Sequence, residues 1–292
     1  MHNYSLRGLD VDLSDRRTVS GRLLVAVLAV QVVLTAVINL VVFPSAWLRA
    51  VVFDPVRIVT GGLVTATLLV NLVLLAVVVG GLLVLVGGLR PRDLGLERRK
   101  LPVALAVTLG LWVTLQLVAA GASLYRTGEV AVSPTWGQFG VGLVLGALLA
   151  QVLGNALYEE ILYRGVLLDQ LVLKLRGRRW GLVLALVGSQ TVFSLLHVPN
   201  RLYRGYPLDA LLVSLGMLVL MGLLFALIYH RTGNLLVAVG IHSLVNAPTM
   251  LVASPVSGSY LVVILAVVLV AVWPLLRGRT GRASGPHGVT SS

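Results

Sequence analysis

Long apolar segments separated by arginine-containing turns constrain this chain more than any other feature of its sequence. We distinguish eight such segments, within residues 22–43, 58–89, 101–124, 139–175, 180–197, 208–229, 235–252 and 260–276. A helix needs about 20 predominantly apolar residues to cross a bilayer. Spanning elements must also satisfy their own backbone hydrogen bonds, which favours helices. The sequence therefore predicts an all-α, polytopic membrane protein built as a bundle of about eight transmembrane helices.

The composition excludes several other classes of protein. Charged residues make up 12% of the chain and hydrophobic residues 58%, whereas soluble domains carry about 25% charged residues. The chain has no cysteine, so a disulfide framework, a catalytic thiol and cysteine-ligated metals are excluded. The net charge of +12 comes from arginines between the apolar segments rather than on one face. We therefore expect a lipid bilayer as partner and no nucleic acid.

The distribution of Lys and Arg predicts the orientation of the bundle. Eight crossings put both termini on one side, and 17 of the 23 Lys and Arg residues fall on that side. Five lie on the opposite side, and Arg164 lies within the membrane. Loops rich in Lys and Arg stay in the cytosol. We expect a multi-pass protein of a bacterial or archaeal cell membrane with both termini cytosolic.

Three regions follow from this pattern. Residues 1–21 are polar and of mixed charge, which indicates a cytosolic N-terminal tail. Residues 22–276 form the predicted transmembrane helical domain. Residues 277–292 are rich in Gly and Ser, so a disordered cytosolic tail is expected there.

A polar stretch interrupts the fourth apolar segment. Glu159, Glu160 and Arg164 lie where a lipid-buried chain should be apolar. An ionisable residue at this depth costs about 2.5–3.5 kcal/mol on insertion scales and indicates function. On a helix Glu160 and Arg164 share a face and are expected to pair. Glu159 points about 100° away, on the side of Asn155 and Tyr163, where it is free to face a cavity.

Two later apolar segments carry matching polar residues, in residues 193–197 and 242–246. Together the three segments read EExxxR, FxxxH and HxxxN, in that order. This pattern resembles the CPBP intramembrane protease family, also called the ABI or CAAX protease-like family, which includes the type II CAAX prenyl endopeptidases. The resemblance covers residues 140–250, the expected protease core.

The resemblance implies a role for each motif residue. Glu159 corresponds to the base that activates water, and His197 to its partner. His242 and Asn246 correspond to hydrogen-bond donors for the oxyanion. These roles suit the chemistry, because general bases and oxyanion donors are what hydrolysis of a peptide bond requires. Glu160 and Arg164 correspond to a supporting pair, and Phe193 corresponds to the aromatic residue of the family, which shapes the cavity. Asn155 and Tyr163 are expected to line the cavity and contact substrate because they share a helix face with Glu159.

These observations predict an intramembrane endopeptidase that cleaves a membrane-associated peptide or protein, which is either prenylated or unmodified. Zinc catalysis is an alternative, because Glu and His are zinc ligands, but the HExxH spacing is absent. We therefore expect no metal and no cofactor. Two further alternatives are a proton-coupled transporter that uses Glu and His as a relay, and a non-catalytic immunity or scaffold protein of the same family.

Straight parallel helices do not bring the three motifs to one depth. His197 falls near the far end of its segment, whereas Glu159 lies well inside the fourth segment. The sequence therefore predicts that the fourth or fifth segment is kinked, tilted or extended beyond the bilayer.

Overall fold

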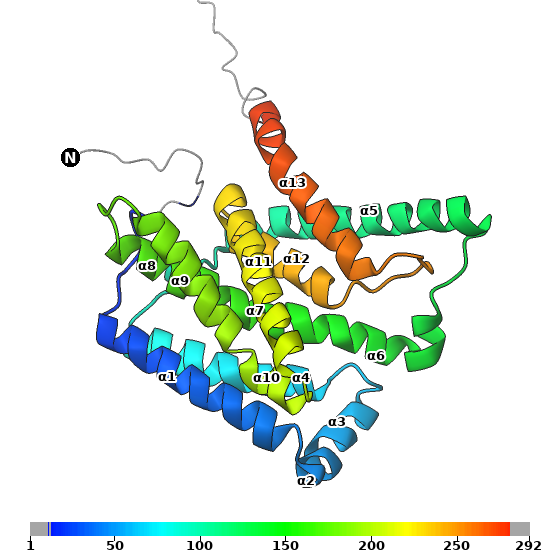
Figure 1. Cartoon of the computed structure of the whole chain (residues 1–292), viewed down its shortest axis with the longest axis horizontal. Helices are drawn as coiled ribbons and strands as arrows, with labels where there is room; N and C mark the ends of the chain where they lie inside the picture. Colours follow the sequence, from blue (N-terminus) through cyan, green and yellow to red (C-terminus); the bar gives the residue numbers. More distant parts are fainter. Residues whose placement is uncertain (1–10, 12, 281–292) are drawn as a thin grey trace, which may run out of the picture.

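The computed structural model describes residue 11 and residues 13–280, with side chains up to residue 275. In this part of the chain the secondary structure is helical, apart from a single antiparallel bridge between Val132 and Val252. Seven of the helices are long and apolar enough to cross a membrane. The predicted class, an all-α polytopic membrane protein, is confirmed (Figure 1).

The first half of the chain supplies three of the seven long helices. α1 spans Gly21–Val37 and continues in wider π-type turns to Val42; α4 spans Ala66–Leu74 and continues in the same way to Val86; α5 spans Leu101–Thr127. Two short helices connect the first pair, α2 over Ala46–Leu48 and α3 over Asp54–Val59.

The second half carries the motifs. Its elements are α6 (Pro134–Val152), α7 (Asn155–Glu159), the π-type segment η6 (Glu160–Leu168), α8 (Asp169–Lys174), α9 (Gly181–Leu195), α10 (Val198–Tyr203), α11 (Leu208–Thr232), α12 (Leu235–Asn246) and α13 (Gly258–Thr280). The long span from Pro134 to Lys174 therefore consists of four consecutive pieces.

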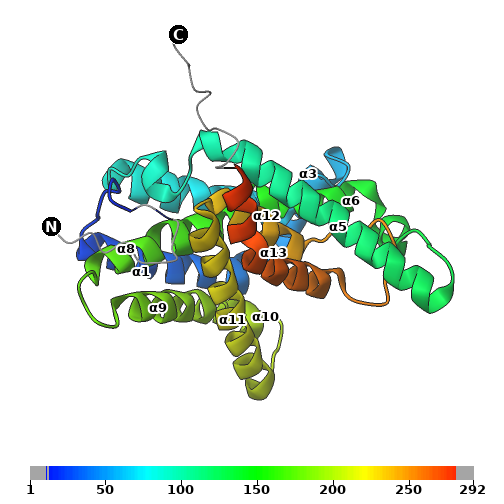
Figure 2. The same ribbon diagram turned by 90° about the horizontal axis from the view of Figure 1, so that it is seen from above.

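The short helix α12 lies in the interior of the bundle. Its 12 residues extend about 18 Å at 1.5 Å per residue, less than the roughly 30 Å of a hydrocarbon core. Nine of its residues are buried, and all nine lie between Leu235 and Leu244. It packs against α5, α6, α11 and α13, and both ribbon views draw it among these helices (Figures 1 and 2). A helix covered on nearly all sides is apolar all round, which explains why its sequence resembles that of a membrane span.

The expected kink is present in both the fourth and the fifth segments. In the fourth, the helix breaks before α7 at Gly154, whose φ of −130° and ψ of −97° are not helical. A side chain would not fit there, because a Cβ on Gly154 would lie 2.6 Å from the Ala150 carbonyl oxygen and 3.1 Å from Asn71. In the fifth, α9 ends at Leu195 and the chain turns through His197 into α10. These two breaks move Glu159 and His197 to a common depth.

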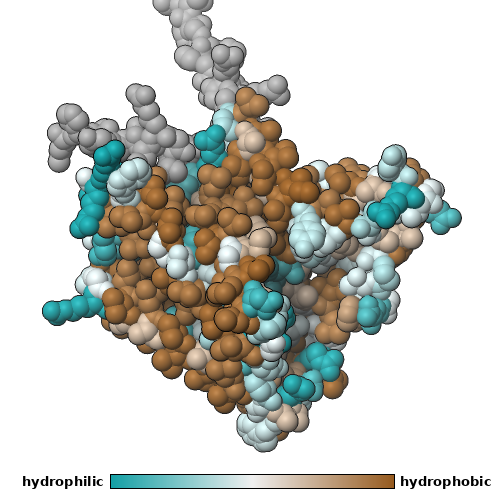
Figure 3. All heavy atoms as spheres, in the orientation of Figure 1, coloured by the Kyte–Doolittle hydropathy of each residue, from teal (hydrophilic) through white to brown (hydrophobic). Residues whose placement is uncertain are grey.

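The exterior of the bundle is suited to lipid. Large apolar side chains on the outer faces are widely exposed, including Leu85, Leu117 and Val213. In the space-filling view an apolar surface covers most of the visible face, and hydrophilic residues gather at its edges (Figure 3). Because soluble proteins rarely expose such large apolar areas, this surface supports the membrane assignment.

The N-terminal segment before α1 is not a free tail in the part that the structure describes. The guanidinium of Arg16 donates to Asp169 Oδ2 at 2.6 Å and to the Tyr229 hydroxyl at 2.7 Å. The Gln170 side chain forms two hydrogen bonds with the backbone of this segment: its Oε1 accepts from the Val19 amide, and its Nε2 donates to the Arg17 carbonyl. The described part of the expected tail therefore packs against α8 and α11, because the buried carboxylate of Asp169 attracts Arg16. Residues 1–10 and 12 lie outside the described residues.

The C-terminal boundary also differs from the expectation. Helix α13 continues to Thr280, so the residues from 277 to 280 are helical rather than disordered. The helix extends beyond the last apolar residue because nothing in this stretch, such as a proline, ends it. The rest of the expected tail, residues 281–292, lies outside the described residues.

Candidate active site

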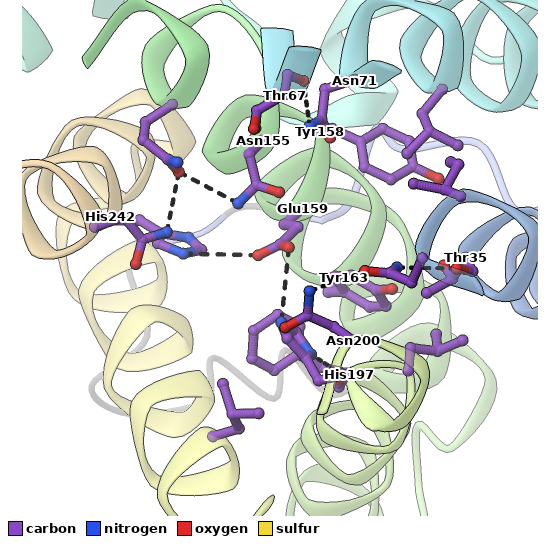
Figure 4. Close-up of a pocket in the computed structure, with 18 of the residues that line it drawn as sticks. Thr35, Thr67, Asn71, Asn155, Tyr158, Glu159, Tyr163, His197, Asn200 and His242 are labelled. Carbon is purple, nitrogen blue, oxygen red and sulfur yellow. Dashed lines mark hydrogen bonds and ion pairs between the residues drawn. The ribbon is translucent and has the colours of Figure 1, made fainter. Parts of the chain in front are cut away.

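The three motifs meet around the carboxylate of Glu159. One Glu159 oxygen lies 3.8 Å from His197 Nε2, and the other lies 3.6 Å from His242 Nε2. Glu159 is the last residue of α7, His197 follows α9, and His242 belongs to α12. The Glu159 side chain keeps 14% of its surface exposed, whereas His242 keeps 5%. Figure 4 shows the carboxylate between the two imidazole rings.

Hydrogen bonds fix the orientation of both imidazoles. His197 Nδ1 lies 2.9 Å from the Phe193 carbonyl oxygen, which only accepts, so Nδ1 carries the hydrogen. His242 Nδ1 lies 2.8 Å from Glu160 Oε1 and donates to it when that carboxylate is ionised. In neutral rings both Nε2 atoms are then acceptors. They face a carboxylate that also accepts, at distances too long for a direct bond. A bridging water has two hydrogens, so it can donate to the carboxylate and to one imidazole at a time.

Glu160 and Arg164 form the expected pair behind His242. Arg164 Nη1 lies 2.9 Å from Glu160 Oε1, and both side chains are fully buried. Arg164 Nη2 also bonds the Gly222 carbonyl oxygen at 3.3 Å. The contact requires a residue without a side chain at position 222, since a Cβ on Gly222 would lie 2.6 Å from Gln190 Oε1 and 3.2 Å from Arg164 Nη2. Glu160 thus accepts from an arginine and a histidine, which compensates a charge that would be costly to bury alone.

Two phenylalanines enclose this network. The Phe193 ring lies under the Arg164 guanidinium at 4.4 Å and packs edge-on against His197, with centroids 4.8 Å apart. The Phe225 ring stacks on His242 with centroids 4.3 Å apart and an interplanar angle of 18°. Both contacts restrict the rings that face Glu159. Phe225 was not predicted, because one aromatic residue in an apolar helix carries no signal of its own.

The two asparagines share one partner. Asn246 Nδ2 donates to Gln151 Oε1 at 3.0 Å, and Asn155 Nδ2 donates to the same oxygen at 3.2 Å. Gln151 lies near the end of α6, just before the break at Gly154. Asn246, the last residue of α12, is exposed. Because each amide nitrogen carries two hydrogens, one remains available to a ligand on each asparagine.

A cavity of about 390 Å³ contains the cluster. Its polar lining includes Thr35, Asn39, Thr67, Asn71, Asn200 and Arg201 in addition to the motif residues. The Tyr158 hydroxyl in its wall donates to Gln31 Oε1 of α1. A polar cavity of this size holds water, which hydrolysis requires.

Seven of the nine predicted site residues line this cavity: Asn155, Glu159, Tyr163, Phe193, His197, His242 and Asn246. Glu160 and Arg164 lie behind the wall, where they contact the lining residues His242, Phe193 and Phe225. The cavity residues from α1, α4 and α10 were not predicted. Single Asn and Gln residues within helices such as α1 and α4 are also typical of helix–helix contacts. The sequence therefore did not distinguish cavity-lining residues from residues that only pack between helices.

The donor set does not form a metal site as placed. Zinc ligands lie about 2.0–2.2 Å from the ion. In the described part of the chain no group of three or more His, Cys, Asp or Glu side chains is arranged to hold a metal ion. His242 also has one ring nitrogen committed to Glu160.

The helical bundle and its buried Glu–His–His cluster define a polytopic membrane protein with a polar site among its helices. Residues 140–248 match the family model described as type II CAAX prenyl endopeptidase Rce1-like. This region contains all three motifs, so over these residues the chain is similar to the CAAX protease-like (CPBP) family. No curated protein and no solved structure matches the chain.

Proposed function

We propose that this protein is an intramembrane endopeptidase that hydrolyses a peptide bond of a membrane-associated peptide or protein. One observation carries the proposal: the Glu159 carboxylate lies between two inward-facing Nε2 atoms, at 3.6 and 3.8 Å, in a polar cavity. This spacing fits a water molecule bound to a base. The family match supports the same class of activity.

The proposed reaction uses this chain's residues alone. Glu159 accepts a proton from the bound water as the water oxygen attacks the carbonyl carbon of the substrate. His197 accepts a hydrogen bond from the water and orients it. The tetrahedral intermediate collapses when the C–N bond breaks and Glu159 returns the proton to the leaving nitrogen. One water is consumed, and the carboxylate is regenerated.

The negative oxygen of the intermediate needs donors. Asn246 has an amide hydrogen beyond the one given to Gln151, and it lies one helical turn after His242. His242 donates from Nε2 only when its ring is protonated, since Nδ1 is committed to Glu160. Donors of this kind contribute most where water is scarce.

The direction of access follows from the proposed orientation. The cavity is lined by the later parts of α1, α9 and α12, by the early part of α4 and by α10. These parts lie away from the ends of the helices that carry the Lys- and Arg-rich turns, and Figure 1 draws α8 and the end of α13 at the opposite end of the bundle from α10. With cytosolic termini in a bacterial or archaeal cell membrane, the substrate would enter from the non-cytosolic side. Reporter fusions after Ser292 and in the loop at Gly205 test this, and a cytosolic signal at Gly205 would contradict it.

The function is tested by proteomics of membranes that contain either the wild-type protein or Glu159→Gln. We expect shortened membrane proteins or peptides, prenylated ones included, only with the wild type. Glu129→Gln is the matched control, because Glu129 is exposed on a loop outside the cavity. Identical cleavage products in all three samples would contradict the proposal.

A further inference from the structure

Arg201 is a cation in the cavity wall that is held by neutral groups. Its Nε donates to the Ser214 hydroxyl at 2.7 Å, and its Nη1 donates to Asn200 Oδ1 at 2.8 Å. The guanidinium lies 5.4 Å from the centre of the Tyr206 ring. These contacts leave further N–H donors of the five that an arginine carries. The side chain is half-buried and lines the cavity.

A chain of neutral hydrogen bonds fixes this position from α1. Asn39 donates through Nδ2 to the Thr35 carbonyl, and Asn39 Oδ1 accepts from Asn200 Nδ2 at 2.9 Å. Asn200 therefore turns its own oxygen toward Arg201. The guanidinium is oriented before any ligand arrives, which reduces the entropy lost on binding.

No carboxylate neutralises this guanidinium. Among the described residues Arg201 forms no ion pair, in contrast to Arg164, whose charge is compensated by Glu160. Glu159 is the single acidic residue of the cavity lining, and it is the proposed base. Arg204, one turn of chain further on, lines the same cavity and is exposed. A partly desolvated, oriented arginine without a counter-ion is suited to an incoming anion.

The position of Arg201 relative to the cluster limits what that anion is. The Arg201 amide donates to the His197 carbonyl at 3.0 Å, so the two residues are one turn apart. One turn rises about 5–6 Å, and an extended peptide covers roughly 3.3–3.6 Å per residue. An anionic group bound to Arg201 would therefore belong to a substrate residue on the order of two to four residues from the scissile bond, which is placed next to Glu159.

We propose that Arg201, with Arg204 at the outer end, forms a subsite for a carboxylate of the peptide substrate. The carboxylate is either the C-terminal one or that of an acidic side chain near the scissile bond. The inference rests on the proposed function, since it assigns a specificity-determining residue to the same cavity. Recognition follows from the planar fork of arginine, which binds a carboxylate through two parallel hydrogen bonds.

Binding of peptide libraries separates the two sources. Purified Glu159→Gln protein in zwitterionic nanodiscs is offered fluorescent apolar hexapeptides in three forms: a free C-terminus, an amidated C-terminus, and an amidated C-terminus with one internal Glu. We expect retention of the first or the third form to exceed that of the second by about 10- to 100-fold, the scale of a hydrogen bond to a charged group. Adding Arg201→Gln should remove the preference, Arg201→Lys should keep part of it, and Arg126→Gln, an exposed arginine outside the cavity, should leave it unchanged.

Equal retention of the three libraries, or retention of none, would overturn the proposal, as would a preference that survives Arg201→Gln. The comparison among libraries on an unchanged Arg201 remains informative even if Arg201→Gln does not fold. The same libraries are then offered to the wild-type protein and analysed for cleavage. Carboxylate-dependent binding without cleavage would reject the endopeptidase and keep the subsite, whereas cleavage without carboxylate preference would reject the subsite alone.

Discussion

His242 Nδ1 lies 2.8 Å from Glu160 Oε1, so the second carboxylate of the pair orients the imidazole that faces the first. The same oxygen accepts from Arg164 at 2.9 Å. Glu160 therefore connects a buried arginine to the proposed reaction centre. The sequence assigned Glu160 only a supporting role beside Arg164, but the contact with His242 gives it a second one as a positioning residue.

This contact predicts a double effect for Glu160→Gln. The substitution leaves Arg164 buried without its counter-charge, which costs about 3–5 kcal/mol in comparable pairs. It also replaces the carboxylate that accepts from His242 Nδ1 and orients that ring. We expect a lower melting temperature together with a cleavage rate reduced by roughly 100- to 1,000-fold, on the scale of a lost oxyanion donor. Melting and cleavage measured on the same purified sample check this, and full activity in a destabilised variant would show that Glu160 does not act through His242.

The N-terminal segment yields a prediction about stability. Arg16 Nη1 lies 2.6 Å from Asp169 Oδ2, with side-chain exposures of 8% and 1%. Burial lowers the pKa of Arg16, but the nearby Tyr229 and Asp169 outweigh it, and the net effect raises the pKa. Arg16→Ala leaves Asp169 buried and unpaired, so we expect a loss of about 3–5 kcal/mol in unfolding free energy. Denaturation in detergent measures it. Arg22→Ala is the control, because Arg22 is exposed and forms no ion pair among the described residues. Equal stability of the two variants would contradict the assignment.

The loop before α5 gives a pH dependence. Burial raises the pKa of Asp93, but hydrogen bonds from the Arg90 side chain and from the Arg90 and Arg17 amides outweigh it, so the net pKa is lowered. A carboxyl with a depressed folded pKa contributes stability that is present above its unfolded pKa, about 3.9, and is lost as the pH falls through the lower folded value.

We therefore expect wild type to melt above Asp93→Asn at neutral pH, with the difference shrinking as the pH falls below about 4. Melting curves at a series of pH values measure this. A difference that stays constant from pH 7 to pH 3 would mean that the Asp93 charge contributes nothing.

Metal dependence separates the two hydrolytic chemistries. Because the proposed mechanism uses Glu159 as the base and needs no metal, we expect cleavage to persist after treatment with a strong chelator. Elemental analysis and activity are measured before and after chelation. Stoichiometric zinc whose removal abolishes cleavage and whose return restores it would contradict this expectation.

The hydropathy pattern predicted the class of fold because apolar length is a property of each segment alone. It did not predict that α12 is a short interior helix, since a helix buried by other helices and one covered by lipid have the same composition. The mismatch in depth predicted a kink but not its place. The break lies at Gly154, where a side chain would collide with the Ala150 carbonyl oxygen, and many other glycines in the chain offered the same possibility.

The motifs identified the candidate site residues, because Glu159, His197 and His242 are ionisable residues within apolar segments. Contacts between segments that are distant in the chain could not be predicted from the sequence. The stacking of Phe225 on His242 and the pair of Arg16 with Asp169 depend on the packing of separate helices. Arg201 was not predicted as a site residue, because arginines are common in the loops that follow the apolar segments of membrane proteins.

The central claim is that Glu159 is the base, and its most direct test is cleavage by purified Glu159→Gln beside wild type and Glu129→Gln. Glutamine keeps the size of the side chain and its hydrogen bonding but does not take the proton. We expect a loss of about 100- to 10,000-fold in cleavage, an unchanged melting temperature and full activity of Glu129→Gln. Cleavage by folded Glu159→Gln at the wild-type rate would contradict the account.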